Sequence, residues 1–169
     1  MFSQAFKVHT SNLYGGMSLE KDPEILNYVK KGLNYTKEKV WPFLRKFKGY
    51  GRFKGPDEIY VTDALPHNSP AATITTRGWF GRLKKILVVS KDIMKYPLGF
   101  VYKIILPHES GHISENISGD LVSEAINDKN LVDIYNRTGD FRTANDIKTH
   151  SGYLHKLYGL YRSLFPFRF

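Results

Sequence analysis

Apolar residues recur at helical spacing along the first third of the chain. Asp22 can cap a helix, and Pro23 suits the first helical position that follows it. The repeat that begins there predicts one long amphipathic helix through Ile25, Val29, Leu33, Thr36, Val40, Leu44 and Phe47. Pro42 should kink or split this helix near Val40, because proline cannot donate the helical hydrogen bond.

Short β-branched runs bounded by turn residues follow the helix. Three such runs predict strands over Glu58–Thr62, Ala71–Arg77 and Lys85–Ser90. They are predicted to form a short antiparallel or mixed three-stranded sheet, and their closeness in the sequence favours an antiparallel meander. The turn between the last two strands holds Trp79 and Phe80, which we expect to be exposed. Residues 1–22 are predicted to be irregular.

The rest of the chain is patterned as helices. Apolar spacing predicts three of them, over Gly99–His112, Ser118–Tyr135 and Thr143–Leu164. Pro107 should bend the first helix or mark its start, and Gly139 should separate the second from the third. The order of elements predicts an α+β fold in a single domain, residues 1–169. Within it, residues 23–112 would form an N-terminal subdomain and residues 113–169 a helical C-terminal subdomain.

The composition restricts the possible functions. The 169 residues include no cysteine, which excludes disulfide scaffolds, thiolate zinc sites, iron–sulfur clusters and cysteine nucleophiles. Any metal must therefore be held by His, Asp or Glu. The sequence shows neither an apolar run of membrane-spanning length nor a secretory signal. We therefore expect a cytoplasmic or particle-associated protein with no membrane partner.

The net charge of +9 is unevenly distributed. From Lys30 to Lys54 there are nine Lys and Arg residues against the single acid Glu38, whereas acids predominate from His108 to Asp146. The basic stretch is typical of the solvated face of a helix, and a groove for nucleic acid is the less favoured alternative. The acidic segment would favour basic or neutral substrates.

The clearest chemical signal is His108-Glu-Ser-Gly-His112. On a helix, side chains at i and i+4 project from one face about 5–6 Å apart, so that two imidazoles can reach one metal ion. Glu109 would flank that ion, where it could hold a hydrolytic water and accept its proton. The apolar residues from Phe100 to Leu106 place this helix in the core, where polar groups need partners. Histidines without a ligand are the alternative interpretation.

The motif is followed by Glu124-Ala-Ile-Asn-Asp128, and the two segments together resemble the thermolysin-type gluzincin metallopeptidases. The resemblance covers residues 23 to about 160. It implies a zincin-like fold, with a long backing helix, a small sheet, an active-site helix, a glutamate helix and a C-terminal helix. The sequence departs from the family in the short gap before Glu124 and in Pro107, directly before the first histidine.

The resemblance also implies how zinc would be bound. The zinc ligands would be His108, His112 and Glu124. Asp128 would accept the second N–H of one histidine and so fix its tautomer. Glu109 would be the general base. Because the gap before Glu124 is short, Glu115 and Asp120 remain open as alternative third ligands.

By the same resemblance, the strand Ala71–Thr76 would lie at the edge of the sheet and pair with an extended peptide. The substrate-binding residues would be Ala71, Ala72, Thr73 and Ile74. An interior strand is the alternative. Trp79 and Phe80 would line a side-chain subsite or cap the core.

By the same resemblance, the last helix would supply a donor for the oxyanion of the reaction. His150 is the first candidate and Tyr153 the second, because they are three residues apart and share a helical face. His155 and Tyr158 are weaker candidates, and packing alone is the alternative for each. His9 and His67 are expected to have no role.

These expectations predict a zinc-dependent metallopeptidase that acts on a peptide or protein substrate. The alternative is a catalytically inactive zincin-fold protein whose basic helix binds nucleic acid, a virion or a partner surface. Hydrolysis of non-peptide amides is a third option. The terminal segment Phe165–Phe169 could pack on the core, dock on a partner or fold into the cleft as a latch.

Overall fold

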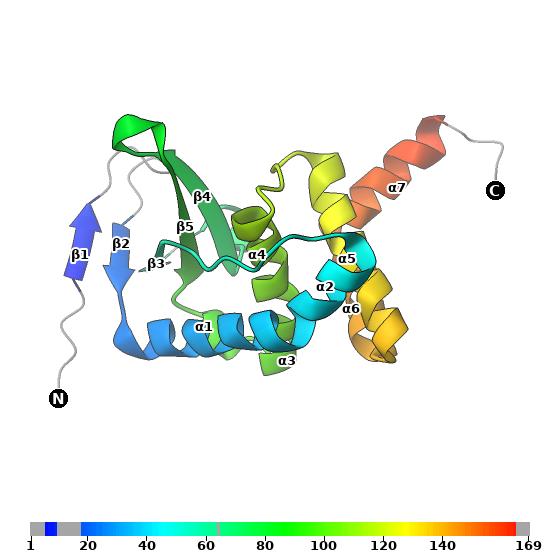
Figure 1. Ribbon diagram of the computed structural model, residues 1–169, viewed down its shortest axis with the longest axis horizontal. Coiled ribbons are helices and arrows are strands. Elements are labelled where there is room, and N and C mark those ends of the chain that lie inside the picture. The colour runs from blue at the N-terminus through cyan, green and yellow to red at the C-terminus, as the bar shows by residue number, and fades with distance from the viewer. Residues whose placement is uncertain (1–5, 10–17, 64, 165–169) are drawn as a thin grey trace.

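A five-stranded mixed sheet lies at one side of the molecule and helices form the other (Figure 1). The computed structural model describes residues 6–9, 18–63 and 65–164. The strands are β1 Phe6–His9, β2 Ser18–Lys21, β3 Glu58–Thr62, β4 Ala71–Arg77 and β5 Leu83–Ser90. Their order in the sheet is β1-β2-β3-β5-β4, so β4 is an edge strand, as the sequence predicts. The α+β class is therefore confirmed.

Two expectations about the sheet are wrong. The three strands that the sequence predicts, β3, β4 and β5, do not form a meander, because β3 and β5 pair in parallel and β4 lies outside β5. The physical reason is the apolar run Ile86–Val89, which is buried along its whole length and therefore takes an interior position. Residues 1–22 are not wholly irregular either. β1 pairs with β2, and β2 pairs with β3 through Leu19, which is 1% exposed.

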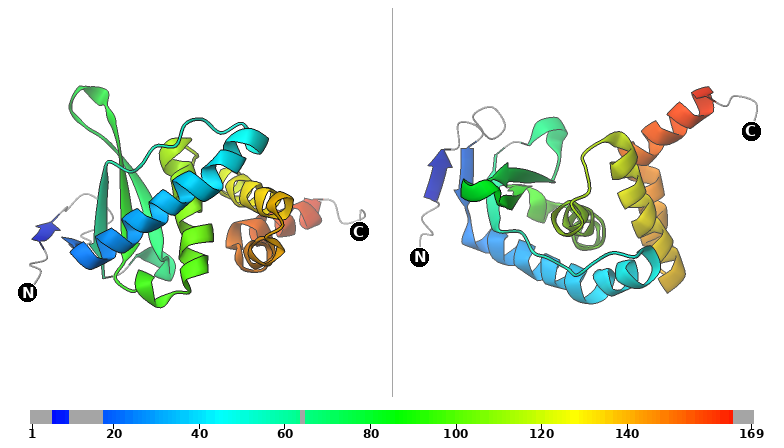
Figure 2. Two further views of the ribbon diagram at one scale, coloured as in Figure 1. Left: turned by 60° about the horizontal axis from the view of Figure 1, so that its bottom comes forward. Right: turned by 45° about the horizontal axis from the view of Figure 1, so that its top comes forward.

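A long, interrupted helix runs along one side of the molecule from the sheet to the later helices (Figure 2, right). It consists of α1 Pro23–Tyr35, a π-helical turn η1 Thr36–Val40, and α2 Trp41–Lys48. Asp22 caps its start by accepting hydrogen bonds from two backbone N–H groups, and Gly49 ends it with a φ of 69°. The predicted interruption near Val40 is confirmed. The wider π turn lies just before Pro42, which cannot donate the next helical hydrogen bond.

The predicted active-site helix repeats this construction. It comprises α3 Leu98–Phe100, a π turn η5 Val101–Ile105, and α4 Leu106–Ser114. Pro107 occupies the first turn of α4, at the same spacing after the π turn as Pro42. α4 crosses α1 closely, since a Cβ added at Gly32 would lie 2.3 Å from Cδ1 of Leu106. The contact fixes α4 between the backing helix and the sheet.

Three further helices complete the chain: α5 Leu121–Thr138, α6 Phe141–His150 and α7 Gly152–Leu164. Gly139 ends α5 in the left-handed conformation, with a φ of 84°. The single helix expected over Thr143–Leu164 is in fact two, because Ser151 adopts an extended conformation between α6 and α7. Its hydroxyl accepts a hydrogen bond from the Leu154 N–H at 3.2 Å, as a helix cap does. Short 3₁₀ turns occur at Pro66–Asn68, Trp79–Gly81 and Ile93–Lys95.

The core has three parts. One joins the sheet to α1 and α4, and includes Val29, Leu87 and Leu106. A second joins α2 to α5 and α6 around Trp41. The third covers the other face of the sheet. Since α1 and α2 contribute to the first and second parts respectively, the backing helix links the two predicted subdomains. None of the helices in the described part of the chain is long and apolar enough to cross a membrane.

Candidate metal centre

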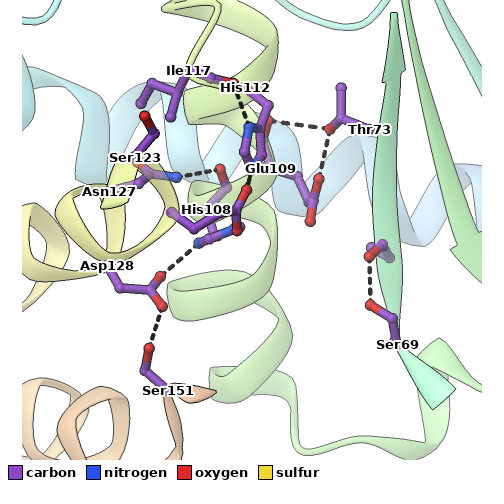
Figure 3. Close-up of polar contacts among 12 residues, drawn as sticks. Ser69, Thr73, His108, Glu109, His112, Ile117, Ser123, Asn127, Asp128 and Ser151 are labelled. Carbon is purple, nitrogen blue, oxygen red and sulfur yellow. Dashed lines mark hydrogen bonds and ion pairs between the residues drawn. The ribbon is translucent and has the colours of Figure 1, made fainter. Parts of the chain in front are cut away.

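Two neighbouring helices bring the three predicted ligands together. His108 and His112 project one turn apart from α4 (Figure 3), and Glu124 comes from the first turn of α5. His108 Nε2 lies 2.9 Å from one carboxylate oxygen of Glu124, and His112 Nε2 lies 2.5 Å from the other. One potential ligand atom of each residue lies within 4.8 Å of those of the other two. The residues therefore converge on a single point.

The outer nitrogen of each histidine ring already has a partner (Figure 3). His108 Nδ1 lies 2.6 Å from Oδ1 of Asp128, and His112 Nδ1 lies 2.7 Å from the carbonyl oxygen of Ile117. Because an ionised carboxylate and a carbonyl oxygen can only accept, each Nδ1 carries a proton and donates it. Each Nε2 therefore faces Glu124, and in the neutral ring its lone pair is available to a metal.

The surroundings of the cluster shift the pKa values of its residues so as to favour bound positive charge. Burial by itself lowers the pKa of both histidines, but hydrogen bonds to Asp128 and Glu124 raise the His108 pKa well above its ordinary value. Burial is also the largest single effect on the His112 pKa, but the hydrogen bonds to Glu124 and to the Ile117 carbonyl, together with the Glu109 charge, outweigh it and raise that pKa. Burial raises the Glu124 pKa, yet the two imidazoles lower it to about 2. The cluster is thus built to hold cationic charge, which protons or a divalent ion can supply.

The donor set and its geometry fit zinc. The Nε2 atoms of His108 and His112 are 3.3 Å apart. Two nitrogens bound tetrahedrally to zinc at 2.0–2.1 Å would be separated by about 3.3–3.4 Å. Imidazole and carboxylate donors suit this ion, and a set of three protein ligands leaves the fourth position to water or substrate. The spacing of the two nitrogens thus suits the ion, whereas the Glu124 oxygens, 2.9 and 2.5 Å from them, would have to move back to about 3.3 Å to bind it as well.

The two alternative third ligands have other partners. An oxygen of Glu115 accepts a hydrogen bond from the Gly51 N–H at 2.5 Å. Asp120 caps α5, where it accepts from the N–H and the hydroxyl of Ser123 at 2.9 and 2.8 Å. These bonds lower the Asp120 pKa to about 2. Each carboxylate is thus engaged in holding the backbone, and Glu124 is the one that reaches the histidines.

Residues outside the motif support its histidines, and the sequence did not point to them. The Ser151 hydroxyl donates to Oδ2 of Asp128 at 2.6 Å, which orients the carboxylate toward His108 (Figure 3). The Asn127 amide donates to the His108 carbonyl oxygen at 2.9 Å and accepts from the Tyr50 hydroxyl at 3.2 Å. For Ser151, the Ser-Gly pair inside a predicted helix was an available signal of a helix start.

Gly111, the small residue of the motif, lets α4 approach α5. A Cβ at this position would lie 2.5 Å from Oδ1 of Asn127. Gly111→Ala is therefore expected to displace the Asn127 amide and break its buried hydrogen bond to the His108 carbonyl. The free energy of unfolding should fall by about 1–3 kcal/mol in chemical denaturation. Gly99→Ala is the matched control, because an added Cβ there meets no atom within 4 Å. Equal stability of the two variants would contradict this account of the packing.

Glu109 lies beside the cluster and faces the sheet (Figure 3). The Thr73 hydroxyl donates a hydrogen bond to Oε2 of Glu109 at 2.6 Å. Glu109 is 8% exposed, and the exposed part lines a cleft. Thr73, expected to bind substrate, therefore also holds Glu109 in place across the gap between β4 and α4. This second role was not visible in the sequence.

A cleft of about 1020 Å³ opens between the edge strand and the helices. Ala71, Ala72 and Thr73 line it together with Glu109 and two of the candidate ligands, His112 and Glu124. Ile74, also expected to bind substrate, has its side chain in the core on the other face of the sheet, as the alternation of a strand requires. Only its backbone can face a ligand paired along β4.

The cleft is lined by cationic as well as anionic side chains, so its lining does not by itself indicate the basic or neutral substrates expected from the acidic segment. Its wall includes the cationic groups of Lys85 and Lys156, and His67, to which we assigned no role, lies there as well. The carboxylates that line it are Glu109 and Glu124, and both are already engaged within the site. Half of the eight acidic residues between His108 and Asp146 belong to the histidine cluster or cap a helix: Glu124, Asp128, Asp120 and Asp140.

The structure places the candidates for the oxyanion donor in different surroundings. The Tyr153 ring stacks on the His108 ring, with centroids 5.8 Å apart and planes at 5°. Burial and the neighbouring Glu124 carboxylate raise the Tyr153 pKa further above neutrality, and its hydroxyl, like that of an ordinary tyrosine, is protonated at neutral pH. The His150 side chain lines the cleft but forms no hydrogen bond with any residue in the described ranges. His155 and Tyr158 line a different pocket, against α5.

Two other expected features lie apart from the cluster. Trp79 and Phe80 are 90% and 101% exposed, so they do not cap the core, and neither lines the cleft. Residues 165–169, the suggested latch, lie outside the described residues.

Comparisons with known proteins identify no relative of the chain. No protein-family profile, curated protein or solved structure matches the chain.

Proposed function

We propose that the chain is a zinc-dependent peptidase whose metal ligands are His108, His112 and Glu124. The observation that carries the proposal is the orientation of the two imidazoles. Each Nδ1 donates to an oxygen acceptor, so each Nε2 is directed at the Glu124 carboxylate. A carboxylate with no histidine partner, that of Glu109, lies next to this set and lines a cleft. Bound zinc would supply Lewis-acid activation of water and of a carbonyl group.

The residues of the chain would supply the remaining chemistry. Glu109 would accept the proton of the attacking water, since its carboxylate faces the cleft beside the ligands. The Thr73 hydroxyl, 2.6 Å away, would hold that carboxylate in position. The Tyr153 hydroxyl, still protonated at neutral pH, would donate to the oxyanion, with His150 as the second candidate.

The arrangement of elements also supports a zincin-like fold. The helix with the two histidines packs between a backing helix and a sheet whose edge strand borders the cleft. That strand, β4, runs antiparallel to β5 and has its other side open to pairing. An extended peptide could add to it through backbone hydrogen bonds, which recognise any sequence and so suit a peptidase.

The test is to measure metal content and peptide cleavage on the same preparation. We expect about one zinc per chain by mass spectrometry, and cleavage of an unfolded protein substrate that a chelator stops and added zinc restores. A chain that binds zinc and cleaves neither peptides nor unfolded proteins would contradict the peptidase and favour the inactive binding protein. Absence of zinc after purification and after reconstitution would contradict the metal centre itself.

A further inference from the structure

The hairpin of β4 and β5 ends in an exposed aromatic tip. Its turn, Trp79–Gly81, projects beyond the rest of the sheet (Figure 1; Figure 2, left). The Trp79 and Phe80 side chains are 90% and 101% exposed, and their ring centroids lie 6.4 Å apart. Large apolar side chains are rarely left so open together unless the surface binds something.

The backbone of the tip is strained to present these rings. Phe80 has a φ of 65°, a left-handed conformation that is unfavourable for a bulky side chain. Glycine or asparagine would close the same turn at lower cost. The Phe80 ring is fully exposed, so it makes no buried contact that could offset this strain. The strain therefore indicates a role for the ring outside the folded chain.

Two arginines flank the aromatic pair. The sequence reads Arg77-Gly-Trp-Phe-Gly-Arg82, and a backbone hydrogen bond from Gly78 to Arg82 at 2.8 Å closes the turn between them. Both arginines are exposed, and neither forms an ion pair with a residue in the described part of the chain. Lys84, the next cation, is instead paired with Glu58 at 2.7 Å. The tip thus combines an apolar apex with free positive charge just behind it.

We propose that this tip inserts into the interfacial region of a membrane that contains anionic lipids. Trp79 and Phe80 would enter at the level of the head groups, where amphipathic and aromatic rings are favoured. Arg77 and Arg82, set back from the apex, would contact lipid phosphates. The sequence predicted no membrane partner, but that expectation rested on the lack of a spanning segment. Peripheral binding by a hairpin needs none.

A lipid surface fits the tip better than a nucleic acid does. Binding of a single strand usually combines stacking with a basic groove that follows the backbone. The tip lines none of the cavities described above. The basic stretch Lys30–Lys54 belongs mainly to α1 and α2, which lie along the opposite side of the molecule from the tip (Figure 1). A protruding apex with cations behind it matches a flat, anionic surface.

The test is sedimentation with lipid vesicles at about 100 mM salt. We expect binding to phosphatidylcholine vesicles containing 30% phosphatidylserine, and at least tenfold weaker binding to pure phosphatidylcholine. The double substitution W79S/F80S should weaken binding to the anionic vesicles at least tenfold, and R77Q/R82Q should reduce both the affinity and its salt dependence. With F80S alone, Trp79 should report insertion by a blue shift of its emission, because the other tryptophan, Trp41, is 1% exposed.

Phe141→Ser is the matched control. Phe141 is also an exposed aromatic residue, 66% open to solvent, but it begins α6, away from the hairpin. Equal loss of binding in this variant would overturn the proposal, as would equal binding to both kinds of vesicle. Absence of vesicle binding, with Trp79 emission quenched instead by a single-stranded oligonucleotide, would overturn it in favour of nucleic acid. Circular dichroism should show that all variants remain folded.

Discussion

Glu109→Gln is expected to reduce peptide cleavage by a factor of about 10²–10⁴, the usual contribution of a general base. The amide has nearly the shape of the carboxylate and can still accept the hydrogen bond from Thr73, but it cannot take a proton from water. Zinc content should remain near that of the unmodified chain, because Glu109 is not in the set of converging ligands. Initial rates on a fluorogenic peptide, together with mass spectrometry of the metal, measure both quantities.

Glu115→Gln provides the control for this experiment. Glu115 lies at the end of the same helix, and its oxygen accepts from the Gly51 N–H, a bond that an amide oxygen can also accept. Cleavage by this variant should stay within about twofold of the unmodified rate. If E109Q were as active as E115Q, Glu109 would have no part in proton transfer. If E109Q lost its zinc as well, the loss of activity would reflect metal binding instead.

The local features of the fold follow from short-range chemistry. The Asp22 cap, the split at Pro42 and the end at Gly139 depend on groups within one or two helical turns, so the sequence predicts them. The pairing of β3 with β5 depends on which strand is buried on both sides, and this is decided by packing across the whole sheet. The spacing of the strands along the chain does not reveal it, although the continuous apolar run Ile86–Val89 was an available signal that β5 lies inside the sheet.

The same distinction applies to the candidate site. The i, i+4 spacing places His108 and His112 on one face of a helix, and this could be expected from the sequence. Contacts between distant segments could not. Thr73 and Glu109 are 36 residues apart, and Ser151 and Asp128 are 23 apart. Glu124 falls between these cases, because it was expected only through resemblance to a family, whereas its place at the histidines depends on how α5 packs on α4.

Glu124→Gln should weaken zinc binding at least a hundredfold. It removes the one anionic ligand and leaves His108 and His112 with a neutral amide. Loss of a residue that only supports a ligand already costs 10–100-fold in affinity, and loss of a ligand should cost more. The effect is measurable as stabilisation by the metal. At a free zinc concentration of 1,000 times Kd, binding adds about 4 kcal/mol to the free energy of unfolding. For a chain of this size, that corresponds to an increase of roughly 8–16 °C in Tm.

After a hundredfold loss of affinity, the same zinc concentration contributes only about 1.4 kcal/mol, or roughly 3–6 °C. Asp133→Asn is the matched control on the same helix, because the Asp133 carboxylate lies at the surface and pairs with Lys48 at 2.6 Å. Removal of this ion pair should lower the Tm slightly in both the metal-free and the zinc-bound states, and so leave the shift caused by zinc unchanged. An undiminished zinc shift in E124Q would mean that the ion is held by other residues. His108 and His112 could not account for that binding by themselves, because two imidazoles without a carboxylate lack the charge that binds a divalent cation tightly.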